Sequence, residues 1–479
     1  MSAANLPEPD PRVLARAGEI VAGLAAILGP DGVIAGEEEK RAYETDALTA
    51  RRQVPLAVIL PRSTEEVSAA LRFLSERGVK VVARGAGTSL SGGALPLADA
   101  VVLGLARMNR ILSVDTANRI AVVEAGVTNL AITETVSDLG FFYAPDPSSQ
   151  LACTIGGNIA MNAGGAHCLK YGVTTNNVLG VKLVLIDGTV VEPGGGQLDA
   201  AGYDLLGLIV GSEGQLGIVT EATVRILRAA EGARPMLFGF ARPEDAGACV
   251  AAIIAAGIIP VAIEYMDRPA IRVCEEFAHA GYPLDVEAML IVEVEGAPAE
   301  IDDLTARITA IAGRHHPLTT RISRSEAESA AIWKGRKAAF GAMGRISDYL
   351  CMDGVIPTGR LADVLVEVGR ICASHSLEVA NVFHAGDGNL HPLIRYNAND
   401  PDELSRAEQC GAEILKLCVE VGGCLTGEHG VGIEKRELMP AQFTPADLTA
   451  QIRVKSAFDP AWLLNPAKVF PLEARREAA

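Results

Sequence analysis

The sequence predicts a protein of mixed α and β structure with more than one domain, and three observations support this. Its 479 residues are too many for one hydrophobic core. Hydrophobic residues make up 49% of the chain and charged residues 21%, which is typical of a globular protein. Short apolar segments alternate with amphipathic stretches, which indicates strands and helices along the whole chain.

The N-terminal elements follow from local signals. Residues 10–29 have an amphipathic helical pattern that closes at Gly29-Pro30, and PLAVIL (55–60) is typical of a buried strand. The sequence Ser63-Thr64-Glu65-Glu66 is a capping box, and Val67, Ala70, Leu71 and Leu74 follow it on one helical face. VKVVA (79–83) predicts a second strand, which runs directly into a glycine-rich loop.

The glycine clusters of the chain all lie in its first half. They occupy 84–93, 154–165 and 211–220, and a hairpin about Asp187-Gly188 lies between the last two. Near residue 230 the clusters stop, and apolar segments alternate with helical stretches at 235–241, 244–257 and 287–296. We therefore expect a domain boundary near 230.

Composition excludes several functions. The net charge of −17 and a pI near 5.0 argue against binding to nucleic acid or to an anionic membrane surface. Nine cysteines without a C-x-x-C pair suit a reducing compartment and argue against an iron–sulfur cluster within the chain. The opening MSAANLPEPDPR lacks a signal-peptide pattern, and the most apolar run, 248–263, is too short to span a membrane. We expect a soluble, cytoplasmic protein.

The segment NVFHAGDGNLHPLI (381–394) places two histidines around an Asp-Gly pair. A two-residue turn at Asp387-Gly388 would set His384 directly opposite His391 on one face of a hairpin. Such partners have Cβ atoms about 4.5–5.5 Å apart, close enough to bind one metal ion. A pair of core or turn histidines is the alternative, and this segment alone does not separate the two.

The first glycine cluster, RGAGTSLSGG, follows a strand and suggests a backbone cradle for phosphate. It is not a Rossmann fingerprint, because Leu90 stands where the third glycine belongs, and no Gly-Lys-Ser/Thr follows as in a P-loop. A plain tight turn is the alternative for one such loop. Three clusters within about 130 residues instead indicate backbone that approaches a ligand closely.

The three clusters and several later motifs resemble a known family. VARGAGTSLSGGALP, YAPDPSSQLACTIGGNIAMNAGG and GSEGQLGIVTEATV look like the flavin-binding half of the vanillyl-alcohol-oxidase/PCMH superfamily. SDYLCMDGVIP, NVFHAGDGNLHPLI, GEHGVGIEKR and LLNPAK are similar to the FAD-linked subunits of bacterial glycolate dehydrogenases (glycolate oxidases). The wider family includes D-lactate and D-2-hydroxyglutarate dehydrogenases.

The resemblance implies an α+β fold: a PCMH-type, two-subdomain FAD-binding domain followed by an α+β C-terminal cap domain. The implied domains are an N-terminal helical segment (1–50), the FAD-binding domain (51–230) and the substrate or cap domain (231–472). FAD is expected to be non-covalent, because 84–93 contains neither His nor Cys, although Cys153 lies beside the second cluster. The implied FAD contacts are Arg84, Gly85, Ala86, Gly87, Thr88, Ser89, Ser91, Pro145, Asp146, Ser148, Ser149, Thr154, Gly156, Gly157, Asn158, Gly164, Gly165, Glu213, Gly214, Ile218 and Asn465.

The resemblance also implies a metal-assisted oxidation of a 2-hydroxy acid by hydride transfer to flavin. His384, His391 and Glu428 match the family's ligands for a divalent metal, which could be Zn, Mn or Fe. His429 is the candidate general base, because imidazole titrates near the working pH. Arg336 matches the arginine that binds the substrate carboxylate, a bidentate role that suits a guanidinium.

Two departures bear on the substrate. Leu393 and Cys351 replace an asparagine and a lysine of hydroxyglutarate-type relatives, which favours a short acid without a second carboxylate. We expect glycolate first and D-lactate second. The implied partners are a second FAD-domain subunit and an iron–sulfur subunit, which could bring the chain to a membrane. A catalytically silent flavin-binding subunit and an oxidase that uses O₂ directly remain alternatives.

Overall fold

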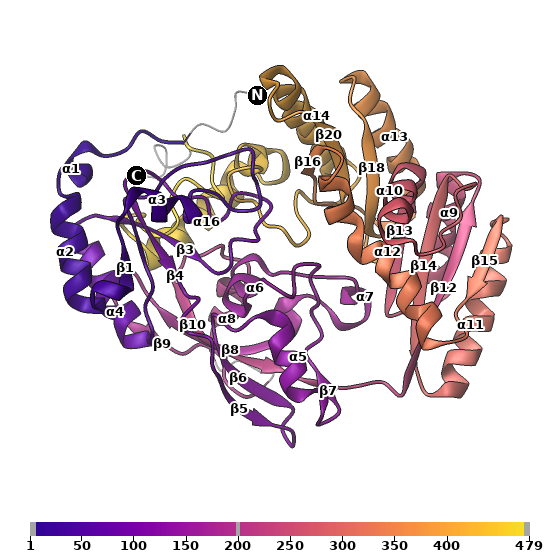
Figure 1. Ribbon diagram of the computed structural model, residues 1–479, viewed down its shortest axis with the longest axis horizontal. Coiled ribbons are helices and arrows are strands. Elements are labelled where there is room, and N and C mark those ends of the chain that lie inside the picture. Colours follow the sequence, from indigo (N-terminus) through magenta and orange to yellow (C-terminus); the bar gives the residue numbers. More distant parts are fainter. Residues whose placement is uncertain (1–5, 198–201, 474–479) are drawn as a thin grey trace. The chain divides into compact units, whose positions relative to one another are not determined.

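The computed structural model describes residues 6–197 and 202–473 (Figure 1). The start of the opening peptide, residues 1–5, lies outside the described residues. The chain forms two compact units, each of which is discontinuous in sequence. The C-terminal unit consists of Gly165–Gly172 and Ala229–Gly427, and the N-terminal unit contains the other described residues. The domain limits 1–50, 51–230 and 231–472 remain a prediction about the sequence.

The first sheet of the N-terminal unit has the order β1-β2-β4-β3. Its strands are β1 (Val33–Ile34), β2 (Ala57–Ile59), β3 (Lys80–Arg84) and β4 (Ala100–Gly104). β2, β4 and β3 are parallel, and β1 adds an antiparallel edge. Helix α4 (Thr64–Ser75) connects β2 to β3, and the Ser63 hydroxyl caps it by accepting the N–H of Glu66. The predicted apolar face of α4 is buried, so this strand–helix–strand prediction is confirmed.

The second sheet of the N-terminal unit is antiparallel, in the order β5-β6-β10-β8-β9. Its strands are β5 (Ile111–Asp115), β6 (Ile120–Glu124), β8 (Val178–Val184), β9 (Val190–Val191) and β10 (Ile218–Arg225). β8 and β9 form the predicted hairpin, and Gly188 in its turn has φ of 84°. The unit also contains α5 (Asn129–Ser137), α6 (Ile155–Met161), α8 (Leu205–Ile209) and the pair β7 (Phe141–Phe142) with β11 (Leu227–Arg228).

The last segment of the chain, from residue 428 onward, returns to the N-terminal unit. It contains α15 (Met439–Gln442) and α16 (Pro445–Phe458). The backbone N–H of Val81 on β3 donates to Leu463, and the N–H of Asn465 donates back to Val81, at 2.8 and 2.7 Å. Lys455 is buried and donates to the carbonyl of Gln215 at 2.6 Å. The segment therefore extends the edge of the first sheet at β3.

The C-terminal unit is built on one large antiparallel sheet, with the path β15-β12-β14-β13-β18-β19-β17. β20 pairs with both β18 and β16. The strands are β12 (Gly232–Phe240), β13 (Ala262–Asp267), β14 (Ala288–Gly296), β15 (Thr319–Ile322), β16 (Asp348–Cys351), β17 (Gly354–Val355), β18 (Val379–His384), β19 (Asn389–Leu390) and β20 (Pro392–Tyr396). The alternation of apolar and helical segments expected after residue 230 is confirmed.

Two groups of helices pack with this sheet (Figure 1). α9 contacts α11 and α13, whereas α10 contacts α12. The helices are α9 (Pro243–Ala255), α10 (Arg268–Ala278), α11 (Pro298–Gly313), α12 (Glu326–Gly344), α13 (Leu361–Ser374) and α14 (Pro401–Glu420). The segment Gly165–Gly172, with the short helix α7 (Cys168–Tyr171), joins them: His167 Nε2 lies 3.3 Å from Glu293, and Lys170 Nζ lies 3.1 Å from Glu295. Residues directly after the second glycine cluster are therefore part of the C-terminal unit.

Two local predictions were wrong. The helix predicted over 10–29 is interrupted into α1 (Pro11–Leu14) and α2 (Ala17–Leu28), because Arg16 adopts φ −105° and ψ 11°, outside the helical region. The turn of the histidine hairpin is longer than two residues: His384 pairs with Asn389, so residues 385–388 form the loop. His391 is therefore diagonal to His384. A shift of two residues keeps the same face of the strand, so both rings still lie together.

None of the helices within residues 6–197 and 202–473 is long and apolar enough to cross a membrane. All nine cysteines are free thiols, and eight of them are buried.

Candidate active site

The first glycine cluster leaves the end of β3, and its own side chains fix its shape. The Arg84 guanidinium donates to the carbonyl of Thr45 at 2.7 Å. At the far end, the Ser89 hydroxyl accepts the N–H of Gly93 at 3.1 Å. The buried Ser91 hydroxyl donates to the carbonyl of His429 at 2.9 Å. Arg84, Ser89 and Ser91 thus all have partners inside the N-terminal unit.

Close approach explains two glycines of this loop. A Cβ at Gly85 would lie 2.3 Å from the Thr154 hydroxyl, which caps α6 by accepting the N–H of Gly157. Gly87 has φ of 75°, a conformation that disfavours any side chain. The first and second glycine clusters therefore meet at the start of α6.

A buried asparagine that the sequence interpretation missed organises the second cluster. Asn129 Nδ2 donates to the carbonyl of Pro145 at 2.9 Å and to Asn158 Oδ1 at 3.1 Å. Helix α6 also packs closely on the end of β6, since a Cβ at Gly156 would lie 2.9 Å from the Ala125 side chain. Asn129 thereby fixes two predicted FAD-binding stretches against each other.

The third cluster is tied to both C-terminal motifs through Glu213 and Asn465. The Glu213 carboxylate accepts the N–H groups of Val431 and Gly432 at 2.6 and 2.8 Å. Burial raises the pKa of Glu213, and these two hydrogen bonds oppose the rise. Asn465 Nδ2 donates to the carbonyls of Glu213 and Gly93 at 2.6 and 3.1 Å. Asn465 therefore joins the first and third clusters.

A buried amine lies in the same unit. Lys468 is 2% exposed, and burial lowers its pKa to about 7 although the charges of Asp46 and Glu213 favour the charged form. Lys468 ends the LLNPAK motif, which predicts no role for it from sequence alone. The N-terminal unit thus places a titratable cation among its glycine clusters.

These features fit an FAD site. Glycines whose Cβ atoms would collide with neighbouring loops form a cradle, which allows backbone N–H groups to approach a diphosphate. The other predicted FAD residues lie in the N-terminal unit, except Gly165: Ala86, Thr88, Pro145, Asp146, Ser148, Ser149, Asn158, Gly164, Gly214 and Ile218. Gly165 starts the segment that packs in the C-terminal unit.

The C-terminal unit contains a buried charged cluster of Glu264, Arg336 and His384, which are 0%, 3% and 6% exposed. Glu264 on β13 is the register partner of His384 on β18. Its carboxylate lies 2.8 Å from His384 Nδ1 and 2.7 Å from both Nε and Nη2 of Arg336. The predicted substrate-binding arginine and a predicted metal ligand therefore share one carboxylate.

His391 lies beside this cluster. Its ring centroid is 5.2 Å from that of His384, with the ring planes at 83°. Its Nε2 atom lies 3.6 Å from Oδ1 of Asp353, which is fully buried. Oδ2 of Asp353 accepts the N–H of Gly427 at 3.0 Å and a hydrogen bond from the Thr426 hydroxyl. Asp353 thus connects His391 to the GEHG motif.

Glu428 and His429 directly follow Gly427, so the Cα of Glu428 is about 3.8 Å from that of Gly427. The unit division falls at this peptide bond: Gly427 ends the C-terminal unit, and Glu428 begins the last segment of the N-terminal unit. Asp353 therefore holds the backbone immediately before the two predicted functional residues.

The donor set fits a divalent metal. Two neutral imidazoles and carboxylates are ordinary ligands for Zn and other first-row ions. The separation of 3.6 Å between His391 Nε2 and Asp353 Oδ1 is too long for a good hydrogen bond. It is close to the roughly 3.4 Å between two tetrahedral ligands at metal distances of about 2.1 Å. Asp353 is thus a further candidate ligand.

Sequence reasoning missed Glu264 and Asp353. Glu264 is an acid inside the apolar strand AIEYMD, and Asp353 lies in the motif SDYLCMDGVIP. A charged residue within a fully buried strand is a usable signal, because burial of a charge requires a partner.

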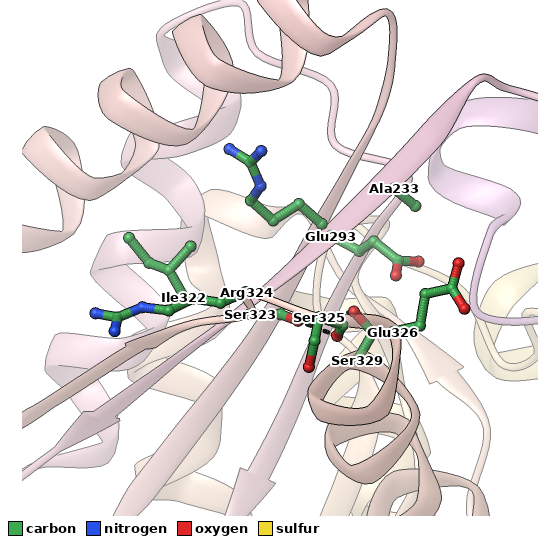
Figure 2. Close-up of a pocket in the computed structure, with 9 residues that line it drawn as sticks. Ala233, Glu293, Ile322, Ser323, Arg324, Ser325, Glu326 and Ser329 are labelled. Carbon is green, nitrogen blue, oxygen red and sulfur yellow. Dashed lines mark hydrogen bonds between the residues drawn. The ribbon is translucent and has the colours of Figure 1, made fainter.

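A separate pocket of the C-terminal unit lies where β12, β14 and β15 meet the start of α12 (Figure 2). Its lining residues are Ala233, Arg234, Glu293, Ile322, Ser323, Arg324, Ser325, Glu326 and Ser329. The hydroxyls of Ser323 and Ser329 are 2.8 Å apart. The Glu264 cluster and the two histidines are not among these residues.

The fold is that of PCMH-type flavoproteins. The chain is similar to p-cresol methylhydroxylase with substrate bound (TM-score 0.82, 17% identity, 96% of this chain and 98% of that chain). It is also similar to 4-ethylphenol oxidase from Gulosibacter chungangensis in its isoeugenol complex (TM-score 0.80, 19% identity, 98% and 100%). These likenesses concern the fold alone.

Family comparison goes further. Residues 55–194 match the family "FAD binding domain", and residues 230–469 match "FAD linked oxidases, C-terminal domain". The chain belongs to the FAD-linked oxidase family and is an FAD-dependent oxidoreductase. The resemblance and the fold class inferred from its motifs are confirmed.

Three curated relatives illustrate the family. The chain is 50% identical to Glycolate oxidase subunit GlcD of Escherichia coli, over 91% of this chain and 87% of the relative. It is 38% identical to Glycolate oxidase subunit GlcD of Bacillus subtilis, over 95% and 97%. It is 33% identical to D-lactate dehydrogenase of Archaeoglobus fulgidus, over 89% and 94%.

Proposed function

We propose that this chain oxidises a short 2-hydroxy acid, glycolate to glyoxylate, as the FAD-bearing subunit of a larger complex. The observation that carries the proposal is the buried cluster of Arg336, Glu264 and His384 beside His391 and Asp353. The names of the relatives favour glycolate, with D-lactate as the second candidate.

Each predicted residue has a chemical task in this proposal. FAD, when bound, would supply the acceptor for the hydride that leaves the α-carbon. His384, His391 and Glu428, with Asp353 as a further ligand, would hold a divalent ion, which would supply Lewis acidity at the substrate hydroxyl. Arg336 binds the substrate carboxylate through its guanidinium, whose Nε donates to Glu264. His429 accepts the hydroxyl proton, so loss of one hydride and one proton gives the 2-oxo acid.

The cofactor and partner predictions extend this proposal. FAD binds without a covalent bond, and denaturation should release all of the flavin. Electrons leave to a second FAD-domain subunit and an iron–sulfur subunit, because the cysteines of this chain lack cluster spacing. We place the complex in the cytoplasm. A partner subunit could attach it to a membrane.

Anaerobic flavin reduction tests the proposal. The purified chain, loaded with FAD and a divalent metal, is mixed with glycolate, D-lactate, L-lactate or D-2-hydroxyglutarate, and the flavin absorbance is followed. Bleaching chiefly by glycolate is the expected result. Bleaching chiefly by D-lactate would keep the mechanism and change the substrate. If no acid bleaches the flavin, a silent or partner-dependent subunit is the better description. Fast reoxidation by O₂ would favour an oxidase.

A further inference from the structure

Glu264 is the centre of the buried charged cluster in the C-terminal unit. It lies on β13, directly opposite His384 on β18, and the side chain of Arg336 reaches it from α12. Its relative exposure is 0%, so its carboxylate is shielded from bulk solvent. Its two oxygens must therefore be satisfied by protein groups.

The two oxygens of this carboxylate serve different partners. Oε1 lies 2.8 Å from His384 Nδ1, whereas Oε2 lies 2.7 Å from both Nε and Nη2 of Arg336. A carboxylate in contact with a guanidinium accepts hydrogen bonds and donates none.

The carboxylate oxygen beside Nδ1 sets the tautomer of His384. It favours the form with the ring proton on Nδ1, in which Nε2 is the acceptor atom of the ring. The ring of His384 is held nearly perpendicular to that of His391, with centroids 5.2 Å apart. Carboxylate–histidine pairs of this kind orient metal-binding imidazoles in many proteins.

The stability of the fold does not explain why such a charged cluster is buried. Removing the Glu264 carboxylate and the Arg336 guanidinium from water has a large desolvation cost, and well-packed apolar residues of similar volume often give equal or better stability. A function for the cluster explains its burial better. The function must use both partners of Glu264, because each of them has a predicted role in the reaction.

We propose that Glu264 is a positioning residue that serves the metal ligand His384 and the carboxylate-binding Arg336 at the same time. Oε1 keeps His384 in the tautomer that can bind a metal, and Oε2 holds the guanidinium of Arg336 in one orientation for the substrate carboxylate. This inference rests on the proposed function. It adds that the metal and the substrate anion are coupled through one side chain.

Glu293 provides a matched control. It lies on the adjacent strand β14, is 7% exposed, and accepts a hydrogen bond from Trp333 Nε1 at 2.9 Å. Trp333 lies on α12, three residues before Arg336, so Glu293 also attaches this helix to the sheet. Its carboxylate also lies 3.3 Å from Nε2 of His167, which is not a predicted ligand.

The test compares Glu264→Gln with Glu293→Gln in the full-length protein. Zn²⁺ and Mn²⁺ affinities are measured by competition with a chromophoric chelator, and KM and kcat for glycolate are measured separately. Glu264→Gln is expected to weaken metal binding by about 10–100-fold, the range typical for removing an outer partner of a metal ligand. KM is expected to rise as well, because the amide N–H groups of glutamine would face the Arg336 donors. Glu293→Gln should change neither quantity by more than about threefold.

Three outcomes separate the hypotheses. If the wild-type protein binds metal and oxidises glycolate, but Glu264→Gln matches Glu293→Gln in metal affinity and KM, the Glu264 inference is wrong. If the wild-type protein binds no metal and no acid reduces its flavin, the proposed function itself fails. If Glu264→Gln does not fold, Glu264→Asp replaces it: this variant keeps the charge but shortens its reach, and an unchanged metal affinity and KM in it would overturn the inference.

Discussion

The N-terminal and C-terminal units build their candidate sites in different ways. In the N-terminal unit, glycines and backbone groups form the candidate FAD cradle, and side chains such as Asn465 and Asn129 connect its loops. In the C-terminal unit, charged side chains from separate strands and a helix converge on Glu264 and Asp353. The first site therefore depends on the room that its glycines leave for a ligand. The second depends on the charges and ligand atoms of its side chains.

This difference determines how each site should respond to substitution. Added bulk should damage FAD binding in the N-terminal unit, while changes of charge there should matter less. Isosteric changes that alter only charge or ligand atoms should stop the chemistry in the C-terminal unit and leave FAD bound.

The largest effect is expected for His391→Asn. Loss of a metal ligand should slow flavin reduction by glycolate by about 10³-fold, the scale of losing a main electrostatic group of a transition state. The FAD content, read from the ratio of visible to ultraviolet absorbance, should stay unchanged. His375→Asn, whose ring pairs with Glu413 at 3.1 Å in the same unit, is the control and should keep its rate. Equal rates of flavin reduction in the two variants would show that His391 has no role in the reaction.

A smaller effect is expected for Arg336→Lys. A lysine carries one point charge and cannot hold Glu264 and a substrate carboxylate in the geometry of a guanidinium. KM for glycolate should rise by about 10²-fold, as expected when a charged hydrogen bond of roughly 2–3 kcal/mol is lost. Steady-state kinetics with glycolate measures this, and a rise in KM no larger than twofold would argue against carboxylate binding by Arg336.

Gly85→Ala tests the space requirement in the N-terminal unit. The new Cβ would lie 2.3 Å from the Thr154 hydroxyl, so the first loop must move away from α6. Overpacking costs about 1–3 kcal/mol, which predicts an FAD dissociation constant raised by roughly 5–150-fold.

Gly195→Ala is the control for Gly85→Ala, since nothing lies within 4 Å of its Cβ position. Titration of the apoprotein with FAD compares the two variants. The cradle hypothesis would lose its support if Gly85→Ala bound FAD as tightly as Gly195→Ala.

The smallest effect concerns pH and Asp267, a buried carboxyl at the end of β13. Burial raises its pKa to about 6, although N–H groups of Ala270 and Asn381 oppose the rise. The pKa of Asp267 is higher in the folded protein than in the unfolded chain. Its contribution to the free energy of unfolding is therefore complete below pH 4 and is lost as the pH rises through 6. Relative to Asp267→Asn, the wild-type protein should lose about 1–3 kcal/mol of stability between pH 5 and pH 8. Calorimetry of both proteins measures the difference in Tm, and a difference that is constant with pH would contradict this assignment.

Sequence alone predicted much of the N-terminal unit because its signals are local. The capping box at Ser63, the turn glycine Gly188 and the three glycine clusters each act over a few neighbouring residues. The same holds for the family resemblance, which rests on short motifs, and for the two histidines, which share a face whichever of the two registers forms. The predicted ligand and flavin roles of individual residues remain predictions.

Only the tertiary structure decided which distant residues meet. Glu264 and His384 are 120 positions apart, and their pairing depends on the order of strands in the large sheet. Asp353 reaches the backbone of Gly427 across 74 positions, and the segment after residue 427 joins the N-terminal unit. Strand order and long-range register are set by the packing of the whole unit, and local turn and periodicity signals do not encode them. The sequence by itself therefore determined the family and the local elements, whereas the charged centre of the site emerged only when the strands came together.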